Sequence, residues 1–260
     1  MFLNKHHGLG NDFLVTIVDS LPADAADLAR KLCHRRLGIG ADGLLFALVE
    51  SNDSTTMVLF NSDGSRPEMS GNGIRCLAHA VTMRDETSEA DILISTDGGP
   101  RQVQVMPGAS PDQIMARVDM GPVGVGPGVH DGLKFDKAAT ADVGNPHLVI
   151  AVPKPADVDL AVAGPALEAG YPEGINVEFI APTVGESDAI DLAVWERGAG
   201  ITQACGTGAC AAATRAHEWG LVGERVTVHM PGGDAVVEVG NPVRLLGPSV
   251  FVATVEYAHG

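Results

Sequence analysis

The sequence predicts a mixed α+β protein whose two halves, each of about 130 residues, share one plan. The first observation behind this prediction is an internal repeat. Three short stretches return in the same order about 135 residues later: GNDFLV from residue 10 as GNPHLV from 144, FN from 60 as WE from 195, and SGNG from 70 as CGTG from 205. Each match alone is weak, but the shared order and spacing indicate a duplication.

The elements of the first half follow one another in a clear order. A helix is predicted over 24–36, with Gly38 just beyond its end. The apolar run at 57–60 predicts a short buried strand. A glycine-rich turn then leads into a helix over 74–84, and the run at 91–96 predicts a further strand.

The second half repeats this order, which is the second observation behind the predicted fold. A strand over 192–195 is followed by a glycine-rich turn and a helix over 209–219, whose alanine run favours helix and close packing. The run at 224–230 predicts the next strand. The last strand-like run, 249–257, could return to the first half.

The predicted boundary between the halves lies near the middle of the chain. The stretch 121–132 is rich in glycine and has the composition of a loop. We therefore assign residues 1–116 and 248–260 to the N-terminal half and residues 117–247 to the C-terminal half.

Composition restricts the class of protein. The net charge of −16 argues against nucleic acid and anionic membrane surfaces as partners, because both attract a surplus of Lys and Arg. No apolar run approaches the roughly 20 residues of a membrane span, and the start of the chain lacks the apolar core of a signal peptide. The four cysteines form no CxxC pair, and no metal-ligand spacing is present. We therefore expect a cytoplasmic protein with no metal site.

The repeat places Ser70 and Cys205 at matching positions, each directly before a Gly-x-Gly that opens a helix. The first N–H groups of a helix have no partner within it, so they can hold a carboxylate and lower the pKa of a thiol beside them. Two such helix starts could grip a substrate carboxylate from both sides, with an acid/base group on each face of the adjacent carbon. That arrangement suits two-base racemisation, in which one group removes the α-proton and the other returns a proton to the opposite face.

Other interpretations of these motifs are weaker. The local sequence alone allows Cys205 to be a small buried residue at a helix start, and the repeat argues against that alternative. GIGADG at 38–43 has the glycine spacing of a dinucleotide-binding turn, but it follows a predicted helix instead of a strand. The GxSxG of many serine hydrolases is absent.

Motifs along nearly the whole chain resemble those of the diaminopimelate epimerases. They occur in that family's order: HGLGNDF (7–13), RRLGIGADG (35–43), FNSDGS (60–65), GNGIRC (71–76), GNPH (144–147), GINVEF (174–179), ERGAGITQACGTGACAA (196–212) and MPGG (230–233). The resemblance implies two similar domains, each a curved, mostly antiparallel sheet around a central helix. It also implies a cofactor-independent interconversion of LL- and meso-diaminopimelate by two cysteines, on the route to lysine and peptidoglycan. A homodimer would be compatible with it.

The resemblance also implies a set of site residues. Cys205 matches the catalytic cysteine of the second half, while His147 and Glu196 match residues that set the proton state of the catalytic groups. Backbone donors for the reacting carboxylate would come from Gly71, Asn72, Gly206 and Thr207. Substrate contacts would come from Asn11, Asn61, Asn145, Asn176, Glu196 and Arg197. The planar guanidinium of Arg197 suits a distal carboxylate, and neutral amides suit a zwitterionic end. Without the resemblance, Glu196 would be interpreted as a solvated charge and Asn61 as a turn residue.

Ser70 departs from the family pattern, because the resemblance places the first catalytic cysteine there. A serine hydroxyl is a far poorer base than a thiolate, since a free thiol already titrates near ~8.5. Cys76 is no replacement in register, because it lies six residues further along the chain, inside the helix. Gly43 is a second departure, at a position where many members carry a substrate-contacting side chain.

Several explanations and functions stay open at this point. The protein could be a natural Ser/Cys variant that still epimerises, a natural variant that works from one face or on another substrate, or a chain with an engineered Cys→Ser change. It could racemise a different small amino or hydroxy acid, although Arg197 favours a substrate with a second polar end. It could also be a binding protein that has lost catalysis, which would bind diaminopimelate without exchanging its proton.

Overall fold

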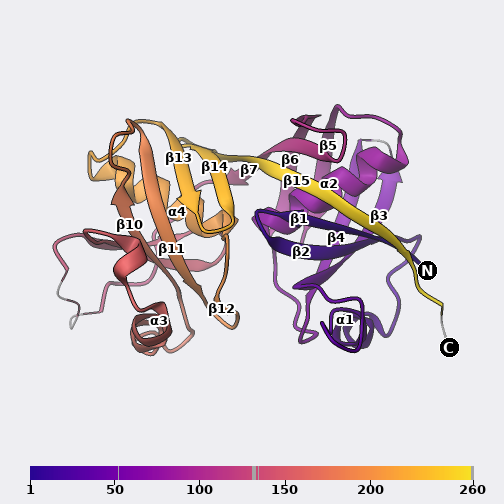
Figure 1. Ribbon diagram of the computed structural model, residues 1–260, viewed down its shortest axis with the longest axis horizontal. Coiled ribbons are helices and arrows are strands. Elements are labelled where there is room, and N and C mark those ends of the chain that lie inside the picture. Colours follow the sequence, from indigo (N-terminus) through magenta and orange to yellow (C-terminus); the bar gives the residue numbers. More distant parts are fainter. Residues whose placement is uncertain (52, 131–132, 134, 259–260) are drawn as a thin grey trace. The chain divides into compact units, whose positions relative to one another are not determined.

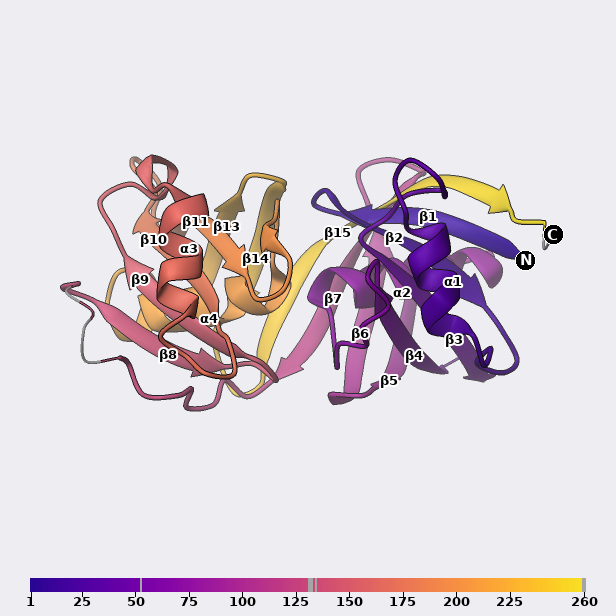
Figure 2. The same ribbon diagram turned by 90° about the horizontal axis from the view of Figure 1, so that it is seen from below.

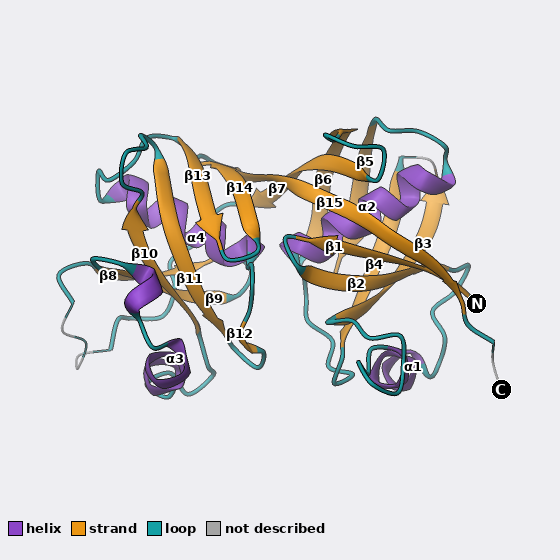
Figure 3. Ribbon diagram, in the orientation of Figure 1, coloured by secondary structure: helices purple, strands orange, loops and turns teal. Residues whose placement is uncertain are grey.

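The computed structural model describes residues 1–51, 53–130, 133 and 135–258. Over these residues the chain forms mostly β-strands with four α-helices, so the predicted mixed α+β class is confirmed (Figures 1 and 3). The chain divides into two compact units, Met1–Val118 with Gly247–Gly260, and Asp119–Leu246. The ends of the predicted 121–132 loop and of the 248–260 segment, at 131–132 and 259–260, lie outside the described residues.

The first unit is a curved sheet around helix α2 (Gly71–Arg84). Its strands neighbour one another in chain order: β1 (Phe2–Gly8), β2 (Asn11–Ile17), β3 (Gly43–Ser51), β4 (Ser54–Asn61), β5 (Ala90–Thr96), β6 (Gly99–Pro107) and β7 (Gln113–Gly121). The last strand, β15 (Val243–Glu256), neighbours β7 and also pairs with β1, so these strands close into a ring. Helix α2 contacts β1 to β6 and is buried over most of its length, so it forms the core of this unit (Figure 1).

The second unit is built in the same way around helix α4 (Gly206–Glu218). Its strands are ordered β8 (Ala138–Asp142), β9 (Pro146–Ala151), β10 (Asn176–Pro182), β11 (Ala189–Glu196), β13 (Arg225–Met230) and β14 (Gly233–Glu238), followed by β15. The short strand β12 (Gly200–Ile201) pairs with β11. Helix α4 contacts all six of the strands from β8 to β14 on this path, and its buried alanines allow them to come close.

The sequence repeat returns as a repeat of topology. In the first unit, β2 and β3 pair in parallel across α1 (Ala25–Leu32), and β4 and β5 pair in parallel across α2. In the second unit, β9 and β10 pair across η1 (Pro155–Asp157) and α3 (Leu160–Glu168), and β11 and β13 pair across α4. A parallel pair needs a long crossover, and a helix supplies each one. Helices α1 and α3 lie outside their sheets (Figure 2).

The two central helices begin three residues earlier than the sequence predicts, at Gly71 and Gly206. The reason is that the preceding side chain caps each helix. Ser70 Oγ accepts a hydrogen bond from the Gly73 N–H at 3.0 Å, and Cys205 Sγ accepts one from the Gly208 N–H at 3.3 Å. Such a side-chain acceptor satisfies one of the N–H groups that the first turn leaves without a partner.

Helix α1 is shorter than predicted, because it ends at Leu32 instead of residue 36. The N–H groups of Ile39 and Gly40 bond back to the Leu32 carbonyl at 2.8 and 3.0 Å and close the turn. A Cβ on Gly38 would lie 2.3 Å from the Lys31 carbonyl oxygen, so this turn has room only for glycine.

Strand β15 returns the chain to the first unit, as the run 249–257 suggests. Phe2 of β1 lies opposite Glu256 of β15. The terminal amino group of Met1 donates to the Tyr257 carbonyl at 3.0 Å, and the Tyr257 N–H donates to the Met1 carbonyl at 2.8 Å. Within the described part of the chain, no helix has both the length and the apolar composition needed to cross a membrane.

Candidate active site

Cys205 lies at the start of α4 with its side chain almost fully enclosed. The residue is 4% exposed and has extended backbone angles, as a helix cap requires. Its Sγ accepts from the Gly208 N–H and lies 3.5 Å from Thr207 Oγ1. A thiol is therefore held at the positive end of a helix, inside the second unit.

Two carboxyl groups lie close enough to this thiol for their charges to affect it. Glu196, at the end of β11, is one of the two, and it accepts a hydrogen bond from Thr202 Oγ1 at 2.5 Å. Glu178, on β10, reaches the same helix turn, because a Cβ on Gly208 would lie 2.6 Å from Glu178 Oε1. Both residues come from strands that contact α4.

Burial raises the pKa of the Cys205 thiol well above its ordinary value, and the charges of Glu196 and Glu178 raise it further. The hydrogen bonds from Thr207 and Gly208 oppose this shift without reversing it. The helix start thus lowers the pKa of this thiol as expected, through the Gly208 N–H, but burial and the two carboxyl groups outweigh it, so the net shift is upward. Burial also raises the pKa of Glu196, partly offset by its bonds to Thr202 and Cys205.

His147 lies on β9 beside these groups and is completely buried. Its Nδ1 is 2.6 Å from Glu178 Oε1, and its Nε2 is 2.9 Å from Asn145 Oδ1. Asn176 lies opposite His147 in the β9–β10 pair. The β9–β10 pairing thus brings His147, Asn145, Asn176 and Glu178 together from two separate stretches of sequence.

Asn176 and Arg197 form the outer part of this cluster. Asn176 donates to the Pro146 carbonyl at 2.9 Å and accepts from the Arg197 N–H at 3.0 Å. The Arg197 guanidinium is exposed and donates to the Glu173 carbonyl at 2.9 Å. Its stem passes over Gly174, where a Cβ would lie 2.5 Å from Arg197 Cδ.

The first unit assembles its own group of predicted residues at the start of α2. Asn72 donates to Asn11 Oδ1 at 3.1 Å, and Asn11 donates to Asp42 Oδ2 at 2.7 Å. Arg75 is fully buried and donates to Asn72 Oδ1 at 2.8 Å and to the Gly71 carbonyl at 2.9 Å. This chain of directional bonds fixes the orientation of both amides.

Asn61 and Gly43 lie at the neighbouring strand ends, opposite each other in the β3–β4 pair. The Asn61 amide donates to Ser65 Oγ at 3.0 Å within the following turn. Gly43 is buried, and a Cβ there would lie 2.9 Å from the Phe60 carbonyl oxygen. A side chain at position 43 would therefore collide with the backbone of β4.

The structure adds residues that the sequence reasoning missed. Glu178 and Arg75 are each fully buried and each bond to a predicted site residue, His147 and Asn72 respectively. A charged residue within an otherwise apolar strand or helix was the available signal for both.

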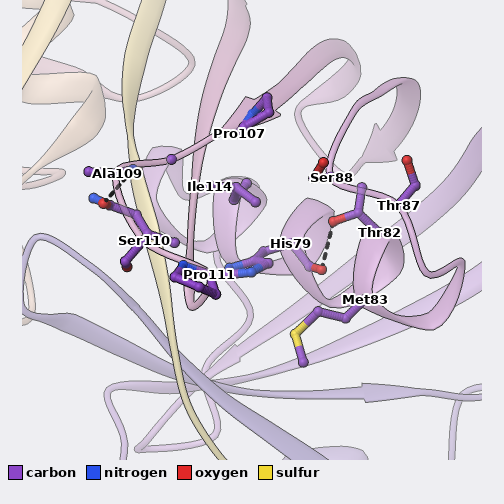
Figure 4. A pocket seen from close by; sticks show the side chains of 12 residues that line it. His79, Thr82, Met83, Thr87, Ser88, Pro107, Ala109, Ser110, Pro111 and Ile114 are labelled. Atoms are coloured by element: carbon purple, nitrogen blue, oxygen red, sulfur yellow. Dashed lines mark hydrogen bonds between the residues drawn. The ribbon is translucent and has the colours of Figure 1, made fainter.

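A separate cavity of about 380 Å³ lies in the first unit, away from the predicted residues. Figure 4 shows its lining by His79, Thr82 and Met83 of α2 and by the turn between β6 and β7. It contains none of the predicted site residues. Among the described residues, no cluster of His, Cys, Asp and Glu could hold a metal ion.

Known proteins resemble this chain over nearly its full length. The family model of diaminopimelate epimerase matches residues 3–125 and 139–252. A diaminopimelate epimerase of Desulfitobacterium hafniense is 40% identical over 278 residues, which cover 97% of this chain and 96% of that protein. A diaminopimelate epimerase of Synechococcus elongatus is 39% identical over 274 residues, which cover 95% of each.

Solved structures share the fold at low sequence identity. A predicted epimerase from Pseudomonas aeruginosa has a TM-score of 0.75 at 16% identity and covers 100% of this chain and 99% of its own. A hydroxyproline epimerase from Agrobacterium vitis has a TM-score of 0.70 at 16% identity, with 98% and 90% covered. These structures support the fold, while the family model and the full-length relatives carry the assignment: the chain belongs to the diaminopimelate epimerase family, a family of isomerases.

Proposed function

We propose that this chain epimerises LL-diaminopimelate to meso-diaminopimelate without a cofactor, by two-base proton transfer at the α-carbon, in the supply of lysine and peptidoglycan precursors. Cys205 is one acid/base group, and Ser70 occupies the place of the other. The observation that carries the proposal is the enclosed Cys205 thiol at the start of α4, with the Glu196 carboxyl group beside it, in a member of this family. The acidic composition and the free cysteines support a cytoplasmic location.

Cys205 is suited to donating a proton. Its raised pKa keeps the sulfur protonated at neutral pH, so the thiol can deliver a proton to a carbanion at the α-carbon. Glu196, whose charge acts on the thiol, and His147 then control how the sulfur regains its proton. In the reverse direction the same sulfur accepts the α-proton.

The helix starts are suited to holding the reacting carboxylate. The N–H groups of Gly206 and Thr207 begin α4, and those of Gly71 and Asn72 begin α2. Negative charge moves onto the carboxylate as the α-proton leaves, and donors at a helix N-terminus stabilise that charge. These N–H groups therefore stabilise the transition state more than the bound substrate, and this difference lowers the barrier to proton transfer.

The remaining site residues are suited to a substrate with two charged ends. Amide groups that can donate and accept come from Asn11, Asn61, Asn145 and Asn176. The exposed Arg197 guanidinium would bind the distal carboxylate. We expect Arg197→Met to reduce diaminopimelate turnover far more than turnover of a short amino acid, and an equal loss on both would favour a racemase of another substrate.

Ser70 is the unusual member of the pair. Its hydroxyl caps α2 as Cys205 caps α4, but it ionises far less readily than a thiol. We propose that the hydroxyl, with a water beside it, exchanges the proton on its face of the α-carbon.

Proton NMR in deuterium oxide tests the proposal, with pure LL- and pure meso-diaminopimelate in separate tubes. We expect loss of the α-proton signal and appearance of the other isomer in both tubes, and no exchange with Cys205→Ala. Exchange of one isomer without inversion would show that Cys205 works alone. Binding without any exchange would replace the enzyme proposal with a binding function.

A further inference from the structure

Arg75 lies at an unfavourable place for a cation. Its side chain is fully buried and reaches back to the Gly71 carbonyl in the first turn of α2, which is the positive end of the helix dipole. Burying a charge is costly unless the group is paired or hydrogen-bonded. The matching residue of α4 is Cys210, so the topology that the two units share does not require a cation here. The reason for Arg75 must therefore lie in its contacts.

The neighbouring strands leave room for the Arg75 guanidinium. A Cβ on Gly8 of β1 would lie 3.0 Å from Arg75 Nη2, and a Cβ on Gly247 of β15 would lie 3.1 Å from Arg75 Cζ. The Nε–H group donates to the Pro248 carbonyl at 3.2 Å. The group is thus held in one place, with Nη2 directed at Asn72 Oδ1, which lies 2.8 Å away.

Four side chains form a row of hydrogen bonds from Arg75 to Asp42. Arg75 donates to Asn72 Oδ1, and Asn72 Nδ2 donates to Asn11 Oδ1 at 3.1 Å. Asn11 Nδ2 donates to Asp42 Oδ2 at 2.7 Å. A guanidinium can only donate and a carboxylate can only accept, so a turned Asn72 would place its NH₂ group against a donor, and a turned Asn11 would place its oxygen against an acceptor. The row therefore admits one orientation of each amide.

Donors also surround the Asp42 carboxylate on its other sides. Its Oδ1 accepts from Arg35 Nη2 at 2.6 Å, and its Oδ2 accepts from the Asp12 N–H at 3.1 Å. Asp12 Oδ1 in turn accepts from the Asp42 N–H at 3.1 Å. These bonds fix the carboxylate, so Asp42 is a fixed acceptor for the Asn11 amide.

We propose that Asp42 and Arg75 are positioning residues of the proposed site, which fix the Asn11 amide so that it offers a ligand an N–H donor. The Asn11 oxygen is already bonded to Asn72, and one of the two amide protons to Asp42. The second amide proton makes no hydrogen bond among the described residues, and Asn11 is partly exposed. This proton suits an acceptor, such as a carboxylate oxygen, and not an ammonium group. The effect on catalysis rests on the proposed function, because it needs Asn11 to contact diaminopimelate.

The orientation of Asn11 can be measured without substrate. Proton–nitrogen NMR of protein labelled with ¹⁵N-asparagine resolves the two protons of each side-chain NH₂ group, and Asn11→Ser identifies the Asn11 pair by its loss. We expect the two Asn11 protons to lie further apart than those of the exposed Asn241, because one of them is bonded to a carboxylate. Asp42→Asn should remove this separation. An Asn11 pair like that of Asn241 in the unmodified protein would overturn the proposal.

Kinetics of Asp42→Asn test the effect on the substrate. The new NH₂ group must face either Asn11 or Arg35, both of which are donors, so the Asn11 amide loses its fixed acceptor. We expect KM for diaminopimelate to rise by about 10- to 100-fold with a smaller change in kcat, because Asn11 would bind the substrate and the transition state alike.

Arg35→Gln is the matched control for this variant. It removes the ion pair of Asp42 and leaves the carboxylate on Asn11. We expect it to keep the Asn11 spectrum and to change KM by less than about fivefold, since an exposed ion pair contributes little. An equal rise of KM in both variants would mean that the carboxylate supports the fold and does not position Asn11.

Gly8→Ala tests the Arg75 end of the row without removing the charge. The methyl group must displace Arg75 Nη2, which donates to Asn72. We expect shifted Asn72 NH₂ signals and a rise of KM by about tenfold. Gly128→Ala, where a Cβ meets nothing within 4 Å, should change neither. An unchanged KM beside shifted Asn72 signals would overturn the role of Arg75.

The inference and the proposed function can fail separately. If Asp42→Asn does not fold, the spectrum of the unmodified protein and the kinetics of Gly8→Ala still decide whether the row positions Asn11. No turnover of diaminopimelate by the unmodified protein, beside the expected Asn11 spectrum, would reject the proposed function and support the orientation of Asn11.

Discussion

Ser70 and Cys205 make equivalent hydrogen bonds to the third residue of their helices, although one cap is a hydroxyl and the other a thiol. Their surroundings differ more than their geometry. Cys205 is enclosed and lies beside two carboxyl groups. Ser70 is partly exposed, and the charged residue buried in the helix that it caps is Arg75. At the scale of single residues, the chemistry of each cap therefore depends on its neighbours.

Ser70→Cys should accelerate the proposed inversion. The new thiol can cap α2 in the same way, and a thiolate is a much stronger kinetic base than a serine hydroxyl at neutral pH. We expect kcat for LL-diaminopimelate to rise by about 100-fold, the lower range of general acid–base effects. The control is Ser187→Cys, at an exposed serine, which should leave kcat unchanged. A slower Ser70→Cys enzyme would mean that the hydroxyl is adapted to its face of the substrate.

Alkylation should report the raised pKa of Cys205. Because only the thiolate reacts and its pKa lies well above the ordinary value, the rate should rise about tenfold per pH unit between pH 7 and 9 without a plateau. Mass spectrometry of iodoacetamide-treated protein would follow this rate peptide by peptide. A rate that is fast and constant from pH 7 upward would show that the thiol is already ionised.

At the scale of elements, the first turn of α4 is packed more tightly than that of α2. A Cβ on Gly208 would lie 2.6 Å from Glu178 Oε1 and 3.2 Å from Cys205 Sγ. A Cβ on the equivalent Gly73 would meet nothing closer than Ser70 Cβ at 3.2 Å. The two glycines occupy the same helix position, so they form a matched pair for mutation.

Gly208→Ala should impair catalysis more than Gly73→Ala does. The methyl group must displace the buried Glu178 carboxylate, which holds His147, whereas at position 73 only a small shift of the Ser70 side chain is needed. We expect kcat/KM to fall by about 100-fold for Gly208→Ala and by less than about 10-fold for Gly73→Ala. Steady-state kinetics with circular dichroism of both proteins would measure this, and equal losses would contradict the packing argument.

The elements also show which features local sequence can predict. Apolar runs and glycine turns located the two central helices and their flanking strands, because these patterns depend on neighbours in the chain. The pairing of His147 with Glu178 was not predictable, because it arises only when β9 and β10 lie side by side. The same limit explains why the net upward shift in the pKa of Cys205 was not predicted: the helix start is visible in the sequence, but the burial and the carboxyl groups that outweigh it are not.

At the scale of the whole molecule, the two duplicated halves share a topology but differ in the side chains that their central helices bury. The central helix of the first unit buries Arg75 and His79, where that of the second unit has Cys210 and Thr214. His6 of β1 packs against His79 with 4.7 Å between ring centroids and against Phe251 at 5.5 Å. The first unit thus buries two histidine rings, His6 and His79, in its core.

These two rings should make the protein sensitive to acid. Burial lowers the pKa of His6 from 6.5 to about 3, and that of His79 from 6.5 to about 4. Below pH 6.5 the unfolded chain binds protons that the folded chain rejects, so the free energy of unfolding falls as the pH drops from 6.5 toward 4. By pH 5, each ring should reduce the free energy of unfolding by about 2 kcal/mol.

Urea unfolding at pH 7.5 and pH 5.0 would measure this dependence, and His6→Leu would isolate one ring. Neither nitrogen of His6 has a hydrogen-bond partner among the described residues, so an apolar side chain of similar size removes the titration without breaking a bond. We expect the difference in unfolding free energy between the two pH values to shrink by about 2 kcal/mol in His6→Leu. His34→Asn, at an exposed ring, should leave the difference unchanged. His79 should maintain the remaining dependence. A difference as large in His6→Leu as in the unmodified protein would mean that His6 is protonated in the folded protein, inside the closed ring of strands around α2.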